Sequence, residues 1–473
     1  MNGRGYICAM PSKKSSIKST SKAAAAKIAV AGAGVGPAAG HFSKVKVEAG
    51  KGRGAVARGT GAGAAASAAA SGAGGRRRFT GRILVRLKQG VSSAVVEQKA
   101  KTRSLKLVSS RDIGSEVLKG LEKVDGVVFE RLGVVVVNEG AAEKVKRLLS
   151  LRDSPFVSSE PERCLYKQAG ARSLKNSAAA TWGIQAINVR NSAYTGKDVK
   201  MAVLDTGFDF THPDFAGRVI HRKSFVGRQA RDREGHGTFC VGIAGGGRKG
   251  KAGPRYGVAS GARLYVGKIL DDAGEGSDAT ALAGIEWALE KGCQVISMSF
   301  GAAVTPGDGY SEIFEDVART AMVHNCLLIA ATGNESDREE GIVALINHPA
   351  NCPSVVAVAA LTEALKVANY SCAGMRKVSG KSSGGRGSRR GGVSREVNIA
   401  APGDNILSAC MGGGHDEESG TSMATPFVAG VVALLWEQFP KASAGEIWDK
   451  LIRGVEPIGQ PKADVGAGLV YMR

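Results

Sequence analysis

Residues 199–207, VKMAVLDTG, decide the fold class of this chain. The short apolar run that ends on Asp-Thr-Gly is typical of a strand buried in a parallel sheet. Similar runs predict strands at 263–269, 295–299, 327–331 and 355–360, and helices are predicted at 235–245, 278–291, 313–324 and 422–439. Strands that alternate with helices predict an α/β fold, in which helices flank a parallel sheet.

Polar residues gather at one edge of the predicted sheet. Asp205 and Asn334 follow predicted strand ends, and His236 and Ser422 lie at predicted helix starts. Ligands of open α/β sheets bind beyond the carboxyl ends of the strands. We therefore expect these four side chains to lie in one crevice.

Three of these residues suit nucleophilic chemistry. A serine hydroxyl needs a base within hydrogen-bond reach, and the base needs an orienting partner. Alone, Ser422 could be a helix N-cap, His236 a loop residue and Asp205 a strand-end turn residue. Together, in Gly-rich frames and in the order Asp, His, Ser, they predict a hydrolase triad.

Residues from about 177 to the C-terminus resemble the subtilisin-like serine protease family. The resemblance implies that Asp205 orients the imidazole, His236 is the general base and then the general acid, and Ser422 is the nucleophile. It also implies that the Asn334 amide and the Ser422 backbone N–H form the oxyanion hole. The matching segments are 182–184, 202–207, 235–238, 299–301, 331–334, 353–358, 401–403 and 419–426.

The same resemblance implies a substrate cleft. An extended peptide would add a strand along Ser299, Phe300 and Gly301. Asn347 would lie near the floor of the pocket for the residue before the scissile bond. The pocket wall would be formed by Ala331, Thr332 and Gly333.

Residues 80–168 predict a smaller domain before the peptidase domain of 177–473. Expected strands at 82–87, within 127–138 and at 155–166 alternate with helices at 91–107 and 141–151, which fits a ferredoxin-like α+β sandwich. This part resembles the propeptide that chaperones and inhibits the family. The resemblance implies a self-processing zymogen cut between Arg163 and Asn176, with the propeptide as an intramolecular inhibitor.

Basic charge is concentrated in two low-complexity segments. Residues 1–78 hold 14 Lys or Arg and one acid, out of a net charge of +21 for the chain. We expect a disordered, solvated leader over 1–79 and a basic Gly/Ser surface insertion at 376–395. Both could instead attract nucleic acid or an anionic surface. No apolar run is long enough for a transmembrane helix.

Metal and redox chemistry receive little support from the sequence. The eight cysteines form no CxxC pair, which argues against zinc, and their number is too low for a disulfide scaffold. The hydrolysis needs no cofactor. Asn398 stands where relatives often place a calcium-binding Asp, and the missing carboxylate weakens the case for a calcium site there. A structural calcium elsewhere stays open, and no ligands are assigned to it.

Departures from the family pattern and the location of the protein leave alternatives open. Phe239 replaces a second His, and Cys240 resembles thiol-containing members, although a small buried core residue also fits. The leader loosely follows the plan of an export signal, but Lys27 interrupts it. Secretion is therefore expected from the family resemblance alone.

Three functions are compatible with the sequence. The first is a serine endopeptidase. The second is a dedicated peptide-processing protease or transpeptidase that acts on one precursor with the same triad. The third, from another class, is a polyanion-binding protein with an inactive hydrolase core.

Overall fold

A parallel sheet forms the centre of the structure, a computed structural model that describes residues 78–113, 117–167, 176, 178–247, 253–374 and 396–473. The basic insertion and the leader up to residue 77 lie outside the described residues. The sheet has seven parallel strands in the order β14-β13-β12-β10-β6-β8-β7, which confirms the predicted fold class. The strands are β6 (Lys200–Asp205), β7 (Ile220–Ser224), β8 (Arg263–Lys268), β10 (Val295–Met298), β12 (Leu327–Ala331), β13 (Val356–Leu361) and β14 (Ile399–Pro402).

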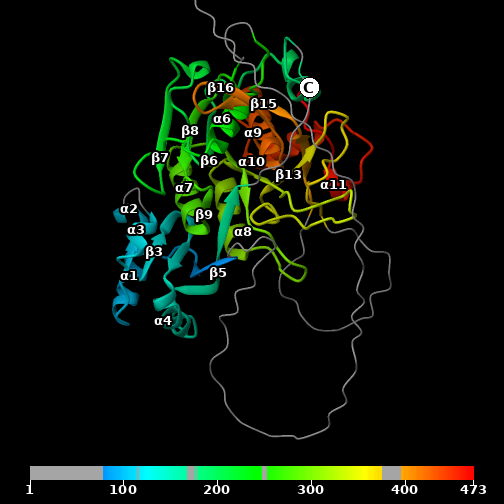
Figure 1. The fold of residues 1–473 in the computed structure, drawn as a ribbon. Coiled ribbons are helices and arrows are strands. Elements are labelled where there is room, and N and C mark those ends of the chain that lie inside the picture. Colours follow the sequence, from blue (N-terminus) through cyan, green and yellow to red (C-terminus); the bar gives the residue numbers. More distant parts are fainter. Residues whose placement is uncertain (1–77, 114–116, 168–175, 177, 248–252, 375–395) are drawn as a thin grey trace, which may run out of the picture. The chain divides into compact units, whose positions relative to one another are not determined.

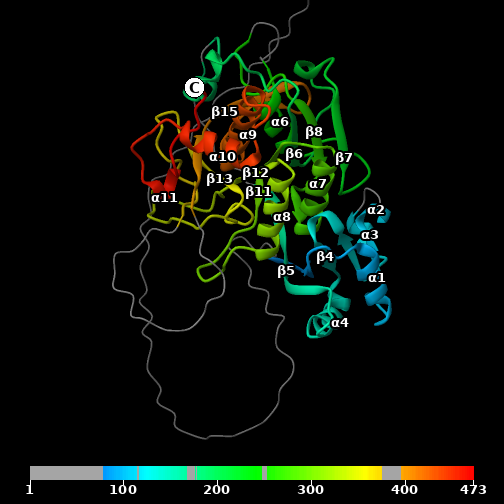
Figure 2. The ribbon, with the colours of Figure 1, turned by 180° about the vertical axis from the view of Figure 1, so that it is seen from behind.

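Helices cover the sheet (Figures 1 and 2). Helix α6 (His236–Gly245) packs against α9 (Thr421–Gln438), which contacts strands β10, β12, β13 and β14. Helices α7 (Asp278–Glu290) and α8 (Glu312–Val323) contact both the central sheet and the N-terminal sheet. The smaller elements are α5 (Trp182–Ala186), α10 (Ala444–Arg453), α11 (Lys462–Val465) and the hairpin of β15 (Ile406–Cys410) and β16 (Gly414–Glu418).

The N-terminal part of the described chain forms a second sheet. Its strand order is β5-β1-β4-β3-β2, with antiparallel neighbours from β5 to β3, as a split βαβ sandwich requires. Its elements are β1 (Phe79–Leu87), α1 (Ser93–Lys101), β2 (Leu107–Ser109), α2 (Ser110–Ile113), α3 (Val117–Leu121), β3 (Gly126–Phe129), β4 (Val134–Val137), α4 (Glu139–Leu149) and β5 (Phe156–Lys167).

One helix prediction in this part was wrong. The helix predicted over 91–107 ends at Lys101, and Leu107 begins β2 instead. Ser104 has a positive φ of 53°, a left-handed conformation that an α-helix cannot continue through.

Strand β5 links the two sheets. Its C-terminal end lies between two short strands of the larger part, β9 (Glu275–Ser277) and β11 (Phe300–Gly301), and pairs antiparallel with both (Figure 1). The end of the N-terminal sheet therefore runs along the edge of the parallel sheet where the polar residues were expected.

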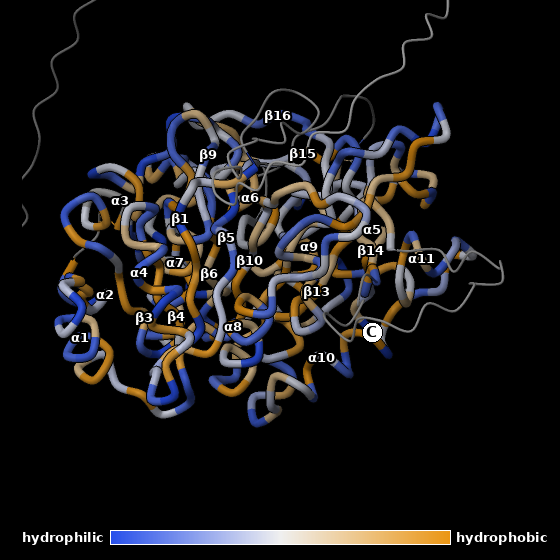
Figure 3. Tube along the Cα trace, turned by 90° about the horizontal axis from the view of Figure 1, so that it is seen from below, coloured by the Kyte–Doolittle hydropathy of each residue, from blue (hydrophilic) through white to orange (hydrophobic). Residues whose placement is uncertain are grey.

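The core explains why the strands read as apolar runs. Met201 to Leu204 of β6 are at most 1% exposed, and Figure 3 shows hydrophobic residues along β6 and β10 in the interior. Strands buried on both faces place almost every side chain in the core. No described helix has both the length and the apolar character needed to span a membrane.

Candidate active site

Asp205 and His236 meet at the carboxyl edge of the sheet. Asp205 is the last residue of β6, His236 is the first of α6, and Nδ1 of the imidazole lies 2.8 Å from Oδ1 of the carboxylate. Both side chains are buried. Because the Asp205 carboxylate can only accept a hydrogen bond, Nδ1 of His236 carries the proton and Nε2 keeps a lone pair. Nε2 has no hydrogen-bond partner among the described residues, so it is free to accept a proton.

Two glycines allow the loops that carry these residues to approach closely. Gly207 has φ of +115°, and a Cβ there would lie 2.5 Å from the Ala230 carbonyl oxygen. A Cβ on Gly237 would lie 2.3 Å from the Gly207 carbonyl oxygen. The glycines of the two motifs are therefore required by direct backbone packing between the Asp205 and His236 segments.

Asp232 is a site residue that the sequence reasoning missed. Its Oδ1 accepts hydrogen bonds from Thr206 Oγ1 and from the backbone of Glu234 and Gly235, at 2.9 to 3.0 Å. Its Oδ2 accepts from both the backbone N–H and the hydroxyl of Thr238. One buried carboxylate thus ties the residue after Asp205 to the first turn of α6. An acid four residues before His236 was the available signal, because Asp favours helix N-termini.

The charge of His236 depends on its partner. Burial by itself would lower the pKa of His236, but the Asp205 carboxylate and, to a smaller extent, Cys240 together outweigh burial and raise this pKa well above its ordinary value. Cys240 lies one helical turn on, with Sγ 3.9 Å from Nδ1. Burial raises the pKa of the Cys240 thiol, so the thiol is neutral near pH 7.

Ser422 lies in the first turn of α9 and contacts Cys240 and Ser299. Its carbonyl oxygen is 3.7 Å from Cys240 Sγ, the same atom that contacts His236. Its hydroxyl donates to the Ser299 carbonyl at 2.9 Å, and the Ser299 hydroxyl donates to the Ser422 carbonyl at 2.8 Å. Asp205 and His236 are therefore paired, Cys240 contacts both His236 and the Ser422 carbonyl, and the Ser422 hydroxyl is turned toward Ser299.

Pro426 explains part of this arrangement. It is the sixth residue of α9 and lies inside the helix. Proline has no N–H, so the carbonyl four residues earlier, on Ser422, loses its intrahelical donor. The Ser299 hydroxyl takes the place of that donor.

Asn334 presents its amide nitrogen without a partner. Its Oδ1 accepts from the backbone N–H and the hydroxyl of Thr421, both at 2.9 Å, which fixes the amide orientation. Nδ2 is buried and has no hydrogen-bond partner among the described residues. The second N–H of a helix also lacks an intrahelical acceptor, so Ser422 N–H is available beside it.

The predicted substrate residues border the same crevice. Phe300 and Gly301 pair with Lys167 and Tyr166 of β5, while Ser299 contacts Ser422. Asn347 is buried. It lies next to Gly301, where an added Cβ would be 3.2 Å from the Asn347 Cβ.

Glu335 adds a carboxylate next to this predicted pocket. The Asn347 amide donates to both Glu335 oxygens at 3.0 Å. Gly333 adjoins both side chains, and Ala331 and Thr332 precede it at the end of β12. The role of Asn347 as a pocket floor stays a prediction.

Two groups of described residues come close enough to hold a metal ion. One is Asp205, His236 and Cys240, which belongs to the site above, and the other is His212, Asp214 and His415. In the second group Nδ1 of His212 accepts from the Asp214 N–H, and Nε2 contacts the Gly414 carbonyl. Neither group offers the six to eight oxygen ligands of calcium.

Comparison with known proteins agrees with this geometry. The subtilase family model matches residues 196–468, more than half of the chain. The chain belongs to the subtilase family. Membership makes it a hydrolase of the serine endopeptidase type.

Individual relatives are similar at a moderate level. Subtilisin from Bacillus pumilus is 33% identical over 271 residues, which are 57% of this chain and 87% of the relative. Subtilisin E from Bacillus subtilis is 33% identical over the same length, which covers 63% of that relative. The major intracellular serine protease of Bacillus subtilis is 33% identical over 289 residues, 59% of this subtilase and 82% of the relative.

Proposed function

We propose that this subtilase hydrolyses peptide bonds through Asp205, His236 and Ser422. Rotation of the Ser422 hydroxyl from Ser299 toward Nε2 of His236 starts the reaction, and His236 accepts the hydroxyl proton as oxygen attacks the scissile carbonyl. His236 then donates that proton to the leaving amine, and a water molecule that loses its proton to His236 breaks the acyl–Ser422 bond, releases the acid and restores the hydroxyl. The observation that carries the proposal is the unpartnered Nε2 of an imidazole whose Nδ1 is held 2.8 Å from Asp205.

The oxyanion would be held by Asn334 Nδ2 and the Ser422 N–H. An unpartnered buried amide is costly unless a ligand completes it, and the negative oxygen of the tetrahedral intermediate is such a ligand. Asn334→Ala is expected to lower kcat by ~10²–10³-fold with little change in KM. Equal losses in kcat and in substrate affinity would contradict this role.

The direct test is Ser422→Ala in the full chain. We expect the variant to lose hydrolysis of casein and of short peptides, and also to lose cleavage of its own chain. Retention of either activity would overturn the proposal.

We further propose that residues up to the end of β5 form an inhibitory propeptide. The support is that β5 adds a strand between β9 and β11, where an extended substrate would pair. Glu162 Oε1 also accepts the Ala279 N–H at 2.7 Å, at the positive N-terminus of α7. Self-cleavage would then fall between Arg163 and Asn176, near the end of β5. N-terminal sequencing of the processed protein tests this, and a new N-terminus outside 164–176 would contradict it.

Other parts of the function rest on the family resemblance. Export is proposed on that ground, and fractionation of the native source tests it. A structural calcium without assigned ligands is also proposed, and chelation should then lower the unfolding temperature.

The two alternative functions have separate tests. A dedicated processing protease or transpeptidase would use the same triad, so cleavage of unstructured casein decides for the broad endopeptidase. A polyanion-binding protein with an inactive core would bind nucleic acid through residues 1–78 and leave casein intact.

A further inference from the structure

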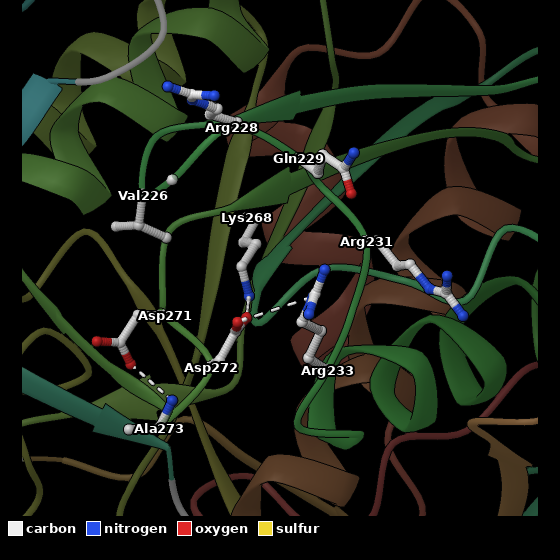
Figure 4. A pocket seen from close by; sticks show the side chains of 10 residues that line it. Val226, Arg228, Gln229, Arg231, Arg233, Lys268, Asp271, Asp272 and Ala273 are labelled. Carbon is white, nitrogen blue, oxygen red and sulfur yellow. Dashed lines mark hydrogen bonds and ion pairs between the residues drawn. The ribbon is translucent and has the colours of Figure 1, made fainter.

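A cavity of about 750 Å³ is lined by several charged side chains (Figure 4). One wall is the segment 226–233, which leads into His236, and the other is 268–273, which leads into β9. Lys268 ends β8 directly opposite Asp205 in the sheet register. The cavity thus borders both the catalytic residues and the strand that pairs with β5.

The two carboxylates of the cavity are already engaged. Asp272 contacts Lys268 Nζ at 3.0 Å and Arg233 Nε at 3.9 Å, and Figure 4 shows these three side chains turned toward one another. Asp271 Oδ1 accepts the backbone N–H groups of Ala273 and Glu275 at 2.9 and 3.0 Å. Asp271 therefore stabilises the turn before β9 and does not neutralise a cation.

The remaining charge of the cavity is positive. Four cationic side chains line it against two acidic ones. Arg228 and Arg231 stand exposed at its rim and form no ion pair with any residue that the structure describes. Arginine binds carboxylates through two parallel hydrogen bonds, and its long side chain can swing into the cavity.

We propose that this cavity is a subsite for an acidic side chain of a polypeptide substrate. Arg228 and Arg231 would supply the charge. The inference rests on the proposed function, with β5 marking the path of the substrate. Tyr166 pairs with Glu275 of β9, two residues beyond Ala273 of the cavity wall, and under the proposed function this part of β5 precedes the scissile bond. The enzyme would then favour Asp or Glu on the N-terminal side of the cut.

Strand β5, the chain's own segment on the proposed substrate path, does not end on an acidic residue. Lys167 is the last residue of β5, and its charge matches that of the cavity. Self-cleavage does not need the subsite, because a tethered segment is present at high effective concentration. A poor side-chain fit would instead help the processed segment to leave.

The experiment compares fluorogenic peptides that carry Glu, Ala or Lys at each of the four positions before the scissile bond. The protein is the full chain after self-processing. We expect one position at which Glu raises kcat/KM about threefold to tenfold over Ala, the range of one or two exposed charge pairs. Lys there should lower it. The Glu advantage should shrink in 1 M salt, because exposed charges are screened.

Charge-reversal variants assign the effect to the cavity. The double variant Arg228→Glu/Arg231→Glu should remove or invert the preference for Glu over Ala peptides. The control is Arg190→Glu/Arg453→Glu, which makes the same charge change at exposed sites outside the cavity and should keep that preference. Labelling by a serine-directed phosphonate checks that each variant folds.

The outcomes separate the two proposals. Cleavage of the Ala peptides without any Glu advantage would overturn the subsite and leave the peptidase proposal standing. No cleavage of any peptide would overturn both. If the charge-reversed variant kept the peptide ratio but lost binding to a single-stranded oligonucleotide, the cavity would be a polyanion site and the subsite proposal would be wrong.

Discussion

Ser299 and Ser422 hold each other through two hydrogen bonds, each from one hydroxyl to the other residue's carbonyl, at 2.8 and 2.9 Å. The pair joins the residue before β11, the proposed substrate strand, to the first turn of α9. One bond supplies a hydrogen-bond donor to the Ser422 carbonyl, which Pro426 leaves without its intrahelical donor. The other holds the proposed nucleophile in a resting position.

Ser299→Ala tests this pairing. The variant leaves the buried Ser422 carbonyl without its strongest donor, which should cost about 1–3 kcal/mol of unfolding free energy. We expect kcat to fall about tenfold, because a looser first turn misplaces Ser422. Urea unfolding and peptide kinetics measure both effects. Ser408→Ala is the control, since its hydroxyl makes a similar 2.8 Å bond to the Phe239 carbonyl. Equal losses of kcat in both variants would contradict the special role of Ser299.

The pH profile should reveal the charge of His236. The imidazole must be neutral to accept a proton, so kcat/KM rises as the imidazolium loses its proton. Because Asp205 raises the pKa of His236, the rise should lie above the ordinary value of 6.5. Asp205→Asn should move it to lower pH. Cys240→Ala should move it in the same direction by less, since Cys240 is a smaller cause of the raised pKa of His236 than Asp205 is. A profile that is flat between pH 5 and 8 would rule out His236 as the base.

Asp232 is expected to act as a positioning residue. An amide in Asp232→Asn cannot accept hydrogen bonds on both atoms, so the contacts with Thr206 and Thr238 cannot all persist. We expect kcat to fall about 10- to 100-fold, as misplaced catalytic groups do, with KM nearly constant. The acid limb of the pH profile should also shift, because the Asp205–His236 distance changes.

The matched control for this variant is Asp198→Asn. Asp198 is exposed and pairs with Arg263 on the surface. A loss of kcat in both variants, or in neither, would show that Asp232 does not position the triad.

Glu162→Gln should loosen the proposed propeptide. The side chain keeps its shape but loses the charge that faces the N-terminus of α7 and Arg82. A charged hydrogen bond of this kind contributes about 1.5–3 kcal/mol, so the cleaved segment should bind about 10- to 100-fold more weakly. The delay between self-cleavage on a gel and the first peptidase activity should shorten. Glu143→Gln, at an exposed pair with Lys146, should leave the delay as it is.

Local patterns carried much of the prediction. Strand β12 matches its predicted bounds, Asp205 pairs with His236 at the predicted sheet edge, and Asn334 binds Thr421, the residue before Ser422. The hairpin of β15 and β16 and the edge strand β7 were not predicted, because mixed polar residues interrupt their apolar pattern.

Long-range contacts explain the rest of what the sequence could not show. Asp232 acts through Thr206, 26 residues away, and no local pattern encodes that contact. Strand β5 pairs with β9 and β11 more than 100 residues later in the chain, a register that depends on tertiary packing.

The central claim is that Ser422 attacks with His236 as its base. A serine-directed phosphonofluoridate should add one adduct to the active protein, peptide mapping by mass spectrometry should place it on Ser422, and His236→Ala should suppress it. Full peptidase activity after complete labelling of Ser422, or an inhibiting adduct on another serine, would contradict the claim.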